Sequence, residues 1–165
     1  MGVMVVFAAS ANGFNFEFAR ISSATGHFSV VLPKPFSELP PNFAVSRTAG
    51  IHPKKSFIIG GKPAPGVNFI ATKMIYQNAA DARSIVKTLT SHEPAGFTRV
   101  YMEDVNAAGL AGVEIKSASK SAVGYRRIFG NGDTVFILSV EAPAANDAEI
   151  KQPARRFLDS LTQKT

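Results

Sequence analysis

The sequence predicts an α+β protein in which a single antiparallel sheet is flanked by helices. Short β-rich segments separated by turn residues occupy most of the chain, one amphipathic helix interrupts them, and a second one closes the chain. The 165 residues are 45% hydrophobic and 18% charged, which is typical of a folded domain and not of a disordered chain. We therefore expect one α+β domain over residues 12–165.

The first third of the chain is predicted to be β-structure. Phe14–Phe18 alternates apolar and polar residues, and Gly26–Leu32 is a second strand that Pro33 ends. Farther on, Val67–Tyr76 is rich enough in β-branched and aromatic residues for a long strand.

The segment between these strands is predicted to be irregular. Seven prolines lie between residues 33 and 65, which favours loops around one short strand at Ser56–Ile59. In this interpretation Gly60–Pro63 is a turn and not a phosphate-binding loop, because a P-loop needs a longer glycine pattern that ends in Lys-Ser or Lys-Thr.

The first helix is predicted to begin after Asn78, a good N-cap, with Asp81 near the positive end of the helix dipole. Its apolar positions follow helical spacing: Ala82, Ile85, Val86 and Leu89.

Four antiparallel strands are expected next. Phe97–Val105 should turn Val100 and Met102 to one face, and Gly112–Ser117 should turn Val113 and Ile115 inward, each strand keeping one face in water. Tyr125–Phe129 and Thr134–Glu141 are predicted to form a hairpin, because the Asn131-Gly132 step between them supplies the positive φ that a tight turn requires.

The last helix is expected to start at Gln152-Pro153, with proline at its first position. It should dock on the sheet through an apolar stripe made of Ile150, Ala154, Phe157, Leu158 and Leu161.

The charge of the chain is uneven. The net charge is +6, and residues 46–75 contain five basic residues and no acidic one. This favours either a solvated loop or a surface for an anionic partner. The candidate binding residues are basic side chains and one histidine at the start of a strand: Arg47, Lys54, Lys55, Lys62, Arg126 and His27. Arg126 and Arg127 point to opposite faces of a strand, so only one of them can join this surface. The other is expected to pair with a carboxylate on a neighbouring strand or to lie over the rim of the core.

The N-terminus allows two interpretations. Residues 1–11 are either the remnant of a signal peptide, with the small-x-small pattern Ala9-Ser10-Ala11, or an ordinary first strand. The first places the protein in the periplasm or outside the cell, and the second in the cytoplasm. No run of 18 apolar residues occurs, so no membrane-spanning helix is predicted.

No catalytic residue, metal site or cofactor is predicted from motifs. His27, His52 and His92 lack metal-ligand spacing, the chain has no cysteine, and no Gly-x-Ser-x-Gly string occurs. Glu103 and Asp104 are neighbours on a strand and so point to opposite faces. The short basic and aromatic pattern at Tyr125–Phe129 does not favour nucleic acid as the partner.

Several segments together carry a family resemblance: Gly26–Pro33, Tyr125–Phe129, Val135–Val140 and Arg156–Leu161. Over residues 26–161 the chain resembles small bacterial proteins of unknown function with a fold similar to PsbP, the extrinsic subunit of the photosynthetic oxygen-evolving complex. The resemblance implies a PsbP-like α/β/α sandwich, export from the cytoplasm, and a non-catalytic role in binding or assembly. It transfers no partner-contact residue, and the chain has no lipobox cysteine.

Three functional hypotheses follow. The first is a non-catalytic extracytoplasmic binding or assembly module that recognises a protein partner through the surface near residues 47–62. The second is a small carrier for an anionic or lipid-like ligand, suggested by the lysine-rich segment and 13 phenylalanines. The third is an enzyme with an unrecognised site, which would require a cleft joining His27 or His92 to a carboxylate. The oligomeric state stays open.

Overall fold

The computed structural model describes residues 14–41 and 50–163. Residues 1–11, for which the sequence predicts a signal remnant or a strand, and the candidate residue Arg47 lie outside the described residues. The elements in chain order are β1 (Phe18–Ser22), β2 (Phe28–Pro33), β3 (Phe36–Leu39), β4 (Lys55–Ala64), β5 (Val67–Ile75), α1 (Ala79–Ser91), β6 (Thr98–Ala107), β7 (Leu110–Ala118), β8 (Ala122–Asn131), β9 (Thr134–Pro143), a 3₁₀ turn (Ala144–Asn146), α2 (Asp147–Leu158) and β10 (Thr162–Gln163).

The strands form two sheets, so the expectation of a single sheet is wrong. A seven-stranded sheet has the order β3-β4-β5-β9-β8-β7-β6, and β1, β2 and β10 form a separate three-stranded sheet. Every neighbouring pair is antiparallel, as predicted. The chain passes from the three-stranded sheet to the seven-stranded sheet between β2 and β3, where Pro33 and Pro35 lack the N–H that would continue strand pairing.

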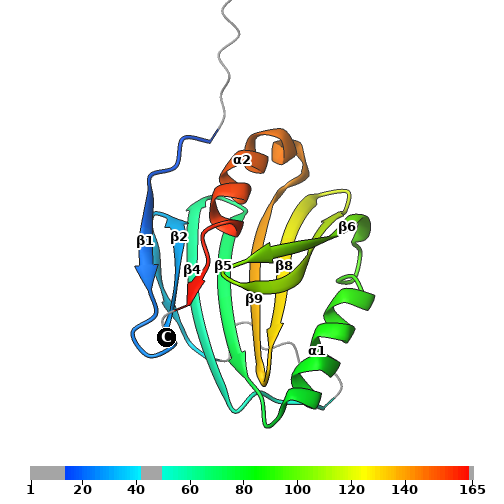
Figure 1. The fold of residues 1–165 in the computed structure, drawn as a ribbon. Coiled ribbons are helices and arrows are strands. Elements are labelled where there is room, and N and C mark those ends of the chain that lie inside the picture. The colour runs from blue at the N-terminus through cyan, green and yellow to red at the C-terminus, as the bar shows by residue number, and fades with distance from the viewer. Residues whose placement is uncertain (1–13, 42–49, 164–165) are drawn as a thin grey trace, which may run out of the picture.

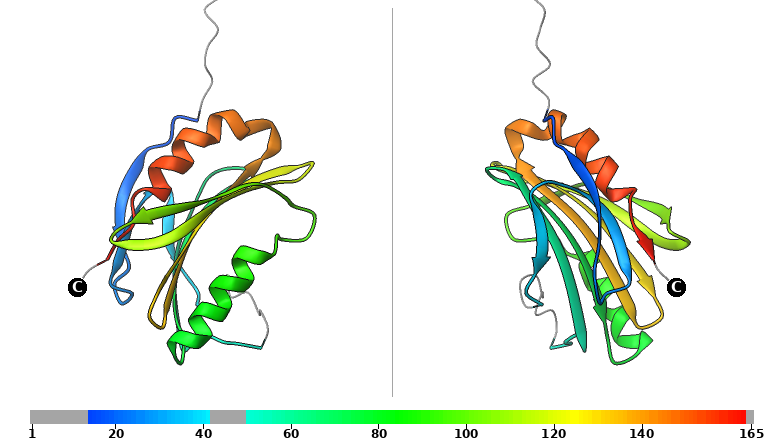
Figure 2. Two further views of the ribbon diagram at one scale, coloured as in Figure 1. Left: turned by 45° about the vertical axis from the view of Figure 1, so that its right-hand side comes forward. Right: turned by 90° about the vertical axis from the view of Figure 1, so that its left-hand side faces the viewer.

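The large sheet lies between two layers. The three-stranded sheet and α2 cover one face, and α1 packs on the other (Figures 1 and 2). The predicted apolar stripe of the last helix is buried, with Phe157, Leu158 and Leu161 at 0%, 1% and 3% exposure. Phe157 meets Phe69 of β5 edge to face, with ring centroids 5.5 Å apart. The main core therefore lies on the α2 side of the large sheet.

β4 is longer than the sequence predicts and contains the segment expected to be a turn. Gly60 and Gly61 lie inside the strand, and the turn falls at Pro65-Gly66 instead. A Cβ on Gly61 would come 2.7 Å from the carbonyl oxygen of Pro33, so glycine is required there by close packing of backbones. Pro63 lies at an irregularity in the β4–β5 register, where its missing N–H interrupts no regular ladder.

The edge strand β6 exposes its apolar residues to water. Val100 and Met102, which the sequence places on one face, are 57% and 48% exposed. The register shifts between Arg99 and Tyr101, and it is these two polar side chains that reach partners: Arg99 contacts Glu93, and the Tyr101 hydroxyl donates to Glu114 over 2.8 Å. β7 was expected to keep one face in water and does not, because Glu114 and Ile115, on opposite faces of the strand, are both buried.

The two helices and the hairpin agree with the sequence in most respects. Asn78 caps α1 by accepting from the backbone N–H of Asp81 over 2.9 Å, and Gly132 supplies the positive φ of the β8–β9 turn. α2, however, begins at Asp147 instead of Gln152, so Pro153 lies inside the helix. Asp147 and Glu149 stabilise the earlier start because they lie at the positive end of the helix dipole. No helix in the described ranges is long and apolar enough to cross a membrane.

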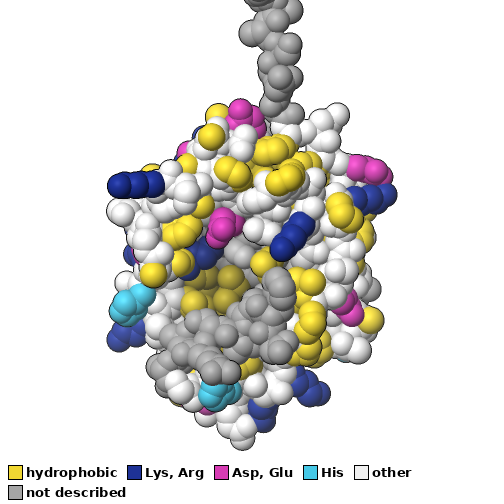
Figure 3. Space-filling model, turned by 180° about the vertical axis from the view of Figure 1, so that it is seen from behind, with side chains coloured by type: hydrophobic (Ala, Val, Ile, Leu, Met, Phe, Trp, Pro, Cys, Tyr) yellow, Lys and Arg dark blue, Asp and Glu magenta, His cyan; other side chains and the backbone are white. Residues whose placement is uncertain are grey.

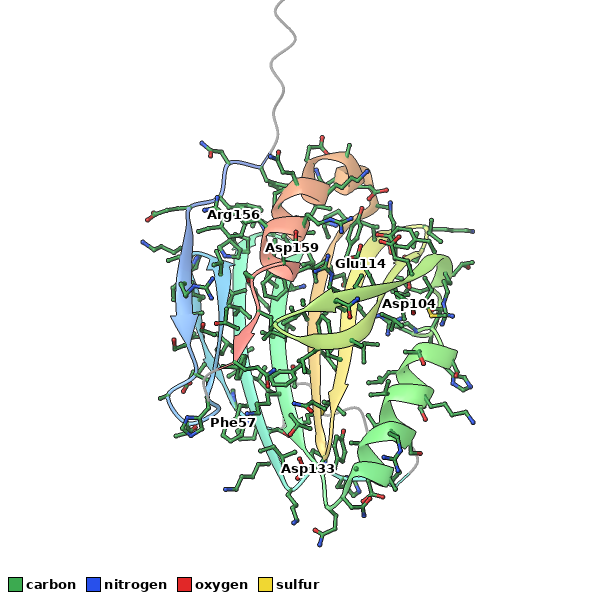
Figure 4. The ribbon with its side chains drawn as sticks, viewed as in Figure 1. Phe57, Asp104, Glu114, Asp133, Arg156 and Asp159 are labelled. Atoms are coloured by element: carbon green, nitrogen blue, oxygen red, sulfur yellow. The ribbon has the colours of Figure 1, made fainter. Side chains whose placement is uncertain are left out.

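A buried ion pair connects β7, β8 and α2. The Arg127 Nε atom donates to Glu114 Oε2 over 2.6 Å, and the two side chains are 5% and 1% exposed. Arg127 also donates to the Leu158 carbonyl oxygen at 3.1 Å and pairs with Asp159 at 2.7 Å, at the end of α2. Figure 4 labels the two carboxylates of this network, Glu114 and Asp159. The expected carboxylate partner for one of the adjacent arginines is thus present on the neighbouring strand.

Arg127→Ala should destabilise the protein by about 3–5 kcal/mol, because it leaves the buried Glu114 carboxylate without its main cation. The exposed pair between Lys34 and Glu17 offers a matched control, and Lys34→Ala should cost less than about 1 kcal/mol. Urea unfolding of the two variants measures both effects. Equal losses in the two variants would contradict this account of Arg127.

Candidate functional site

The face of the large sheet that carries α1 is covered by described helices over only part of its area. Side chains on this face of β5 recur at alternate residues, so Asn68, Ile70 and Met74 share it. Met74 belongs to the cluster beneath α1, together with Ile85 and Val135. Asn68 and Ile70 instead line cavities. Seen from behind Figure 1, the molecule is hollowed near its middle, with hydrophobic atoms inside the hollow and charged side chains beside it (Figure 3).

The first cavity, which we term the apolar chamber, has a volume of about 480 Å³ and lies against β3, β4 and β5. Its apolar lining includes Phe36, Leu39, Gly60, Phe69 and Ile70. Leu39 packs directly against Gly60, because a Cβ on Gly60 would come 2.7 Å from Leu39 Cδ1. The chamber is suited to a hydrocarbon group.

The second cavity, the polar chamber, has a volume of about 350 Å³ and extends across β5, β9, β8 and β7. Its polar lining consists of Lys62, Asn68, Ser117, Arg126, Ser139 and Glu141. The two chambers share the lining residues Lys62, Asn68 and Ile70 and therefore adjoin each other. We refer to both together as the groove.

Arg126 enters the polar chamber from β8 and is fixed by Glu93, which lies between α1 and β6. Arg126 Nη2 donates to Glu93 Oε2 over 2.8 Å, and Arg99 Nε donates to Oε1 over 2.6 Å. The Ser117 hydroxyl also donates to Glu93. One carboxylate therefore holds two guanidinium groups, and the cluster keeps one positive charge.

The electrostatics of this cluster keep Glu93 ionised. Burial alone would raise the pKa of Glu93, but hydrogen bonds from Ser117 and Arg99 and the positive charges of Arg126 and Arg99 outweigh it and lower that pKa. Burial lowers the pKa of Arg126, yet a guanidinium is so strong a base that it stays protonated at neutral pH.

The candidate residues chosen from the sequence fall in different places. Lys62 and Arg126 line the same chamber. Lys55 begins β4, seven residues before Lys62, which is a separation of roughly 20 Å along an extended strand, and Lys54 directly precedes it. His27 is exposed in the turn before β2, with a positive φ of 52°. The structure therefore brings together two of the described candidates and separates the other three from them.

Sequence reasoning missed three residues of the site: Glu93, Arg99 and Ser117. Glu93 follows α1 in a connection, and Ser117 lies 24 residues farther along the chain on β7. No local motif joins them, because their proximity depends on the register of β6, β7 and β8. The only local sign in the sequence is Pro94, which follows Glu93 after a predicted helix and restricts the backbone conformation of Glu93.

Comparison with known proteins establishes the fold. No protein-family model and no curated protein sequence matches the chain. Cyanobacterial PsbP from Synechocystis sp. PCC 6803 is similar in structure, with a TM-score of 0.58 and 9% identity over 96% of this chain and 98% of that chain. LpqN, involved in cell envelope biogenesis of Mycobacterium tuberculosis, has a TM-score of 0.54 and 11% identity over 92% and 93% of the two chains.

A third similar structure is PA94, a protein of unknown function from Pseudomonas aeruginosa, with a TM-score of 0.53 and 14% identity over 91% of this chain and 98% of that chain. Identities this low carry information about the fold alone. The resemblance to PsbP that the sequence suggests is confirmed at that level, and this chain has a PsbP-like fold.

Proposed function

We propose that this chain is a non-catalytic binding module that works outside the cytoplasm and holds its ligand in the groove. The observation that carries the proposal is that the apolar and polar chambers adjoin each other at Lys62, Asn68 and Ile70. Ligand sites are usually concave and mainly apolar, with a few polar groups that fix the orientation of the ligand. The groove has this composition.

The chemistry of Glu93 supports a non-catalytic role. A general base works best when its pKa is near the operating pH, which for a carboxylate requires a raised pKa. The pKa of Glu93 is lowered instead, and both of its oxygens accept hydrogen bonds from arginine. The carboxylate of the groove is therefore suited to fixing Arg126 and poorly suited to removing a proton from Ser117 or a substrate.

The histidines give no support to the enzyme hypothesis. That hypothesis required a cleft in which His27 or His92 meets a carboxylate. His27 and His92 are exposed, and neither lines the chambers of the groove. The His92 ring contacts the carbonyl oxygen of Thr88, at the end of its own helix.

Two observations support a location outside the cytoplasm. The small-x-small pattern Ala9-Ser10-Ala11 is typical of a signal-peptide cleavage site. LpqN, which shares the fold, is involved in cell envelope biogenesis. Both favour an envelope or secreted protein.

Binding in the groove is tested with octyl glucoside, a neutral amphiphile, followed by NMR of the backbone amides. We expect the shifted amides to lie around Ile70 in β4, β5 and β9. Ile70→Glu should weaken binding by about tenfold or more, because it buries a carboxylate in the groove floor. Val31→Glu, a matched change at a half-buried strand position outside the groove, should leave binding unchanged. Shifts confined to any other surface would refute the groove as the binding site.

The ionisation of Glu93 is tested by following its carboxyl carbon by NMR between pH 2 and 8. Its folded-state pKa is lowered, so its midpoint should fall below the usual value of about 4.3. The stability that this carboxylate contributes is present above the unfolded-state pKa and is lost as the pH falls through the folded-state pKa. A midpoint near neutrality would instead indicate a general base and argue for an enzyme.

The location is tested by determining the N-terminal residue of the protein made in its own organism. We expect the mature chain to begin at Asn12, because signal peptidase cleaves after a small-x-small pattern. Recovery of a chain that retains residues 1–11 would contradict export by this route.

A further inference from the structure

We infer that the ligand of the groove is a single-chain amphiphile with one negative charge, whose head group lies between Lys62 and Arg126 and whose hydrocarbon chain enters the apolar chamber. This inference rests on the proposed function and adds to it the chemical class of the ligand and the direction in which it binds.

The charge of the polar chamber selects a monoanion. Glu93 neutralises one of the two arginines that it holds, which leaves one positive charge. Lys62 and Glu141 line the same chamber, and neither forms an ion pair within the described residues. The chamber with its supporting cluster thus carries two unneutralised positive charges and one negative charge. A single negative head group balances it.

The hydrogen bonds of Arg126 point to an anion as well. Its guanidinium gives one hydrogen bond to Glu93 and no other to a described residue. Its side chain is 17% exposed, so its remaining N–H groups lie in a partly dehydrated place where a charge-assisted hydrogen bond is stronger than in water. A carboxylate or sulfate head group accepts such bonds as an anion. An alcohol accepts them only as an uncharged group, and an ammonium group cannot accept them.

The apolar chamber fixes the other end of the ligand. It adjoins the polar chamber at Ile70 and is lined by Phe36 and Leu39 of β3 and by Gly60 of β4. Its volume of about 480 Å³ is within the range of small-molecule sites. Burial of each additional methylene should therefore tighten binding about fourfold until the chamber is full.

The test uses isothermal titration calorimetry with hexanoate, octanoate and decanoate, and with neutral decyl glucoside and cationic decyltrimethylammonium as comparisons. Decanoate should bind the tightest, and the fatty acids should gain affinity with each methylene. Lys62→Gln and Arg126→Gln should each weaken decanoate binding about tenfold while leaving decyl glucoside unaffected. Glu141→Gln should tighten decanoate binding, because it removes the opposing charge.

Lys55→Gln is the matched control, since Lys55 lies on the same strand as Lys62 but outside the groove. It should leave every affinity unchanged. Because Lys62 is exposed and makes no described hydrogen bond, Lys62→Gln keeps the test valid even if Arg126→Gln disturbs Glu93.

The outcomes separate this inference from the proposed function. Equal affinity for decanoate and decyl glucoside, unaffected by Lys62→Gln, would overturn the choice of an anion and leave the groove as a binding site. Failure of all the amphiphiles to bind would overturn both. Sedimentation with phosphatidylglycerol vesicles separates a free ligand from a membrane surface: vesicle binding by a protein that does not bind decanoate would also overturn the inference.

Discussion

The burial of α2 against the large sheet decides which surface of the molecule is left for a ligand. α2 and the three-stranded sheet occupy one face, and α1 is the helix that the described residues place on the other. α1 has 13 residues and is about 20 Å long and 10 Å wide. Seven strands spaced about 4.8 Å apart, the longest with ten residues, form a surface of roughly 29 by 33 Å. One helix cannot cover that area, and among the described residues the groove lies beside the part that α1 covers.

Strand alternation gives two adjacent arginines different roles. Arg127 points toward α2, is 5% exposed, and is bonded to Glu114, Asp159 and the Leu158 carbonyl oxygen. Its hydrogen-bonding capacity is used in holding the last helix on the sheet. Arg126 points to the other face and bonds to Glu93. The same two residues therefore fix the fold on one side of β8 and supply a charge to the groove on the other.

Local patterns predict much of this fold, and they fail where tertiary contacts override them. The β8–β9 hairpin, the capped helix after Asn78 and the buried stripe around Phe157 follow from turn chemistry and periodicity. Gly60 and Gly61 were misread because glycine usually marks turns, whereas here a Cβ would collide with the Leu39 side chain or with the Pro33 carbonyl oxygen. For the site, Lys62 and Arg126 are visible in the sequence as basic residues. Their presence in the same chamber depends on the strand order β4-β5-β9-β8 and on its register, which no local pattern encodes.

Glu93 explains how a groove with apolar walls can keep a fixed positive charge. Arg99 and Arg126 approach the same carboxylate, and without it their mutual repulsion and partial burial would drive the two guanidinium groups apart. Arg99 is also anchored by donating to the Thr90 carbonyl oxygen over 2.6 Å. Arg126 is thereby held in place by α1 and the α1–β6 connection before any ligand arrives. A preorganised charge loses little side-chain entropy on binding. Arg126 is therefore better suited to recognising an anion than a loose cluster of surface lysines would be.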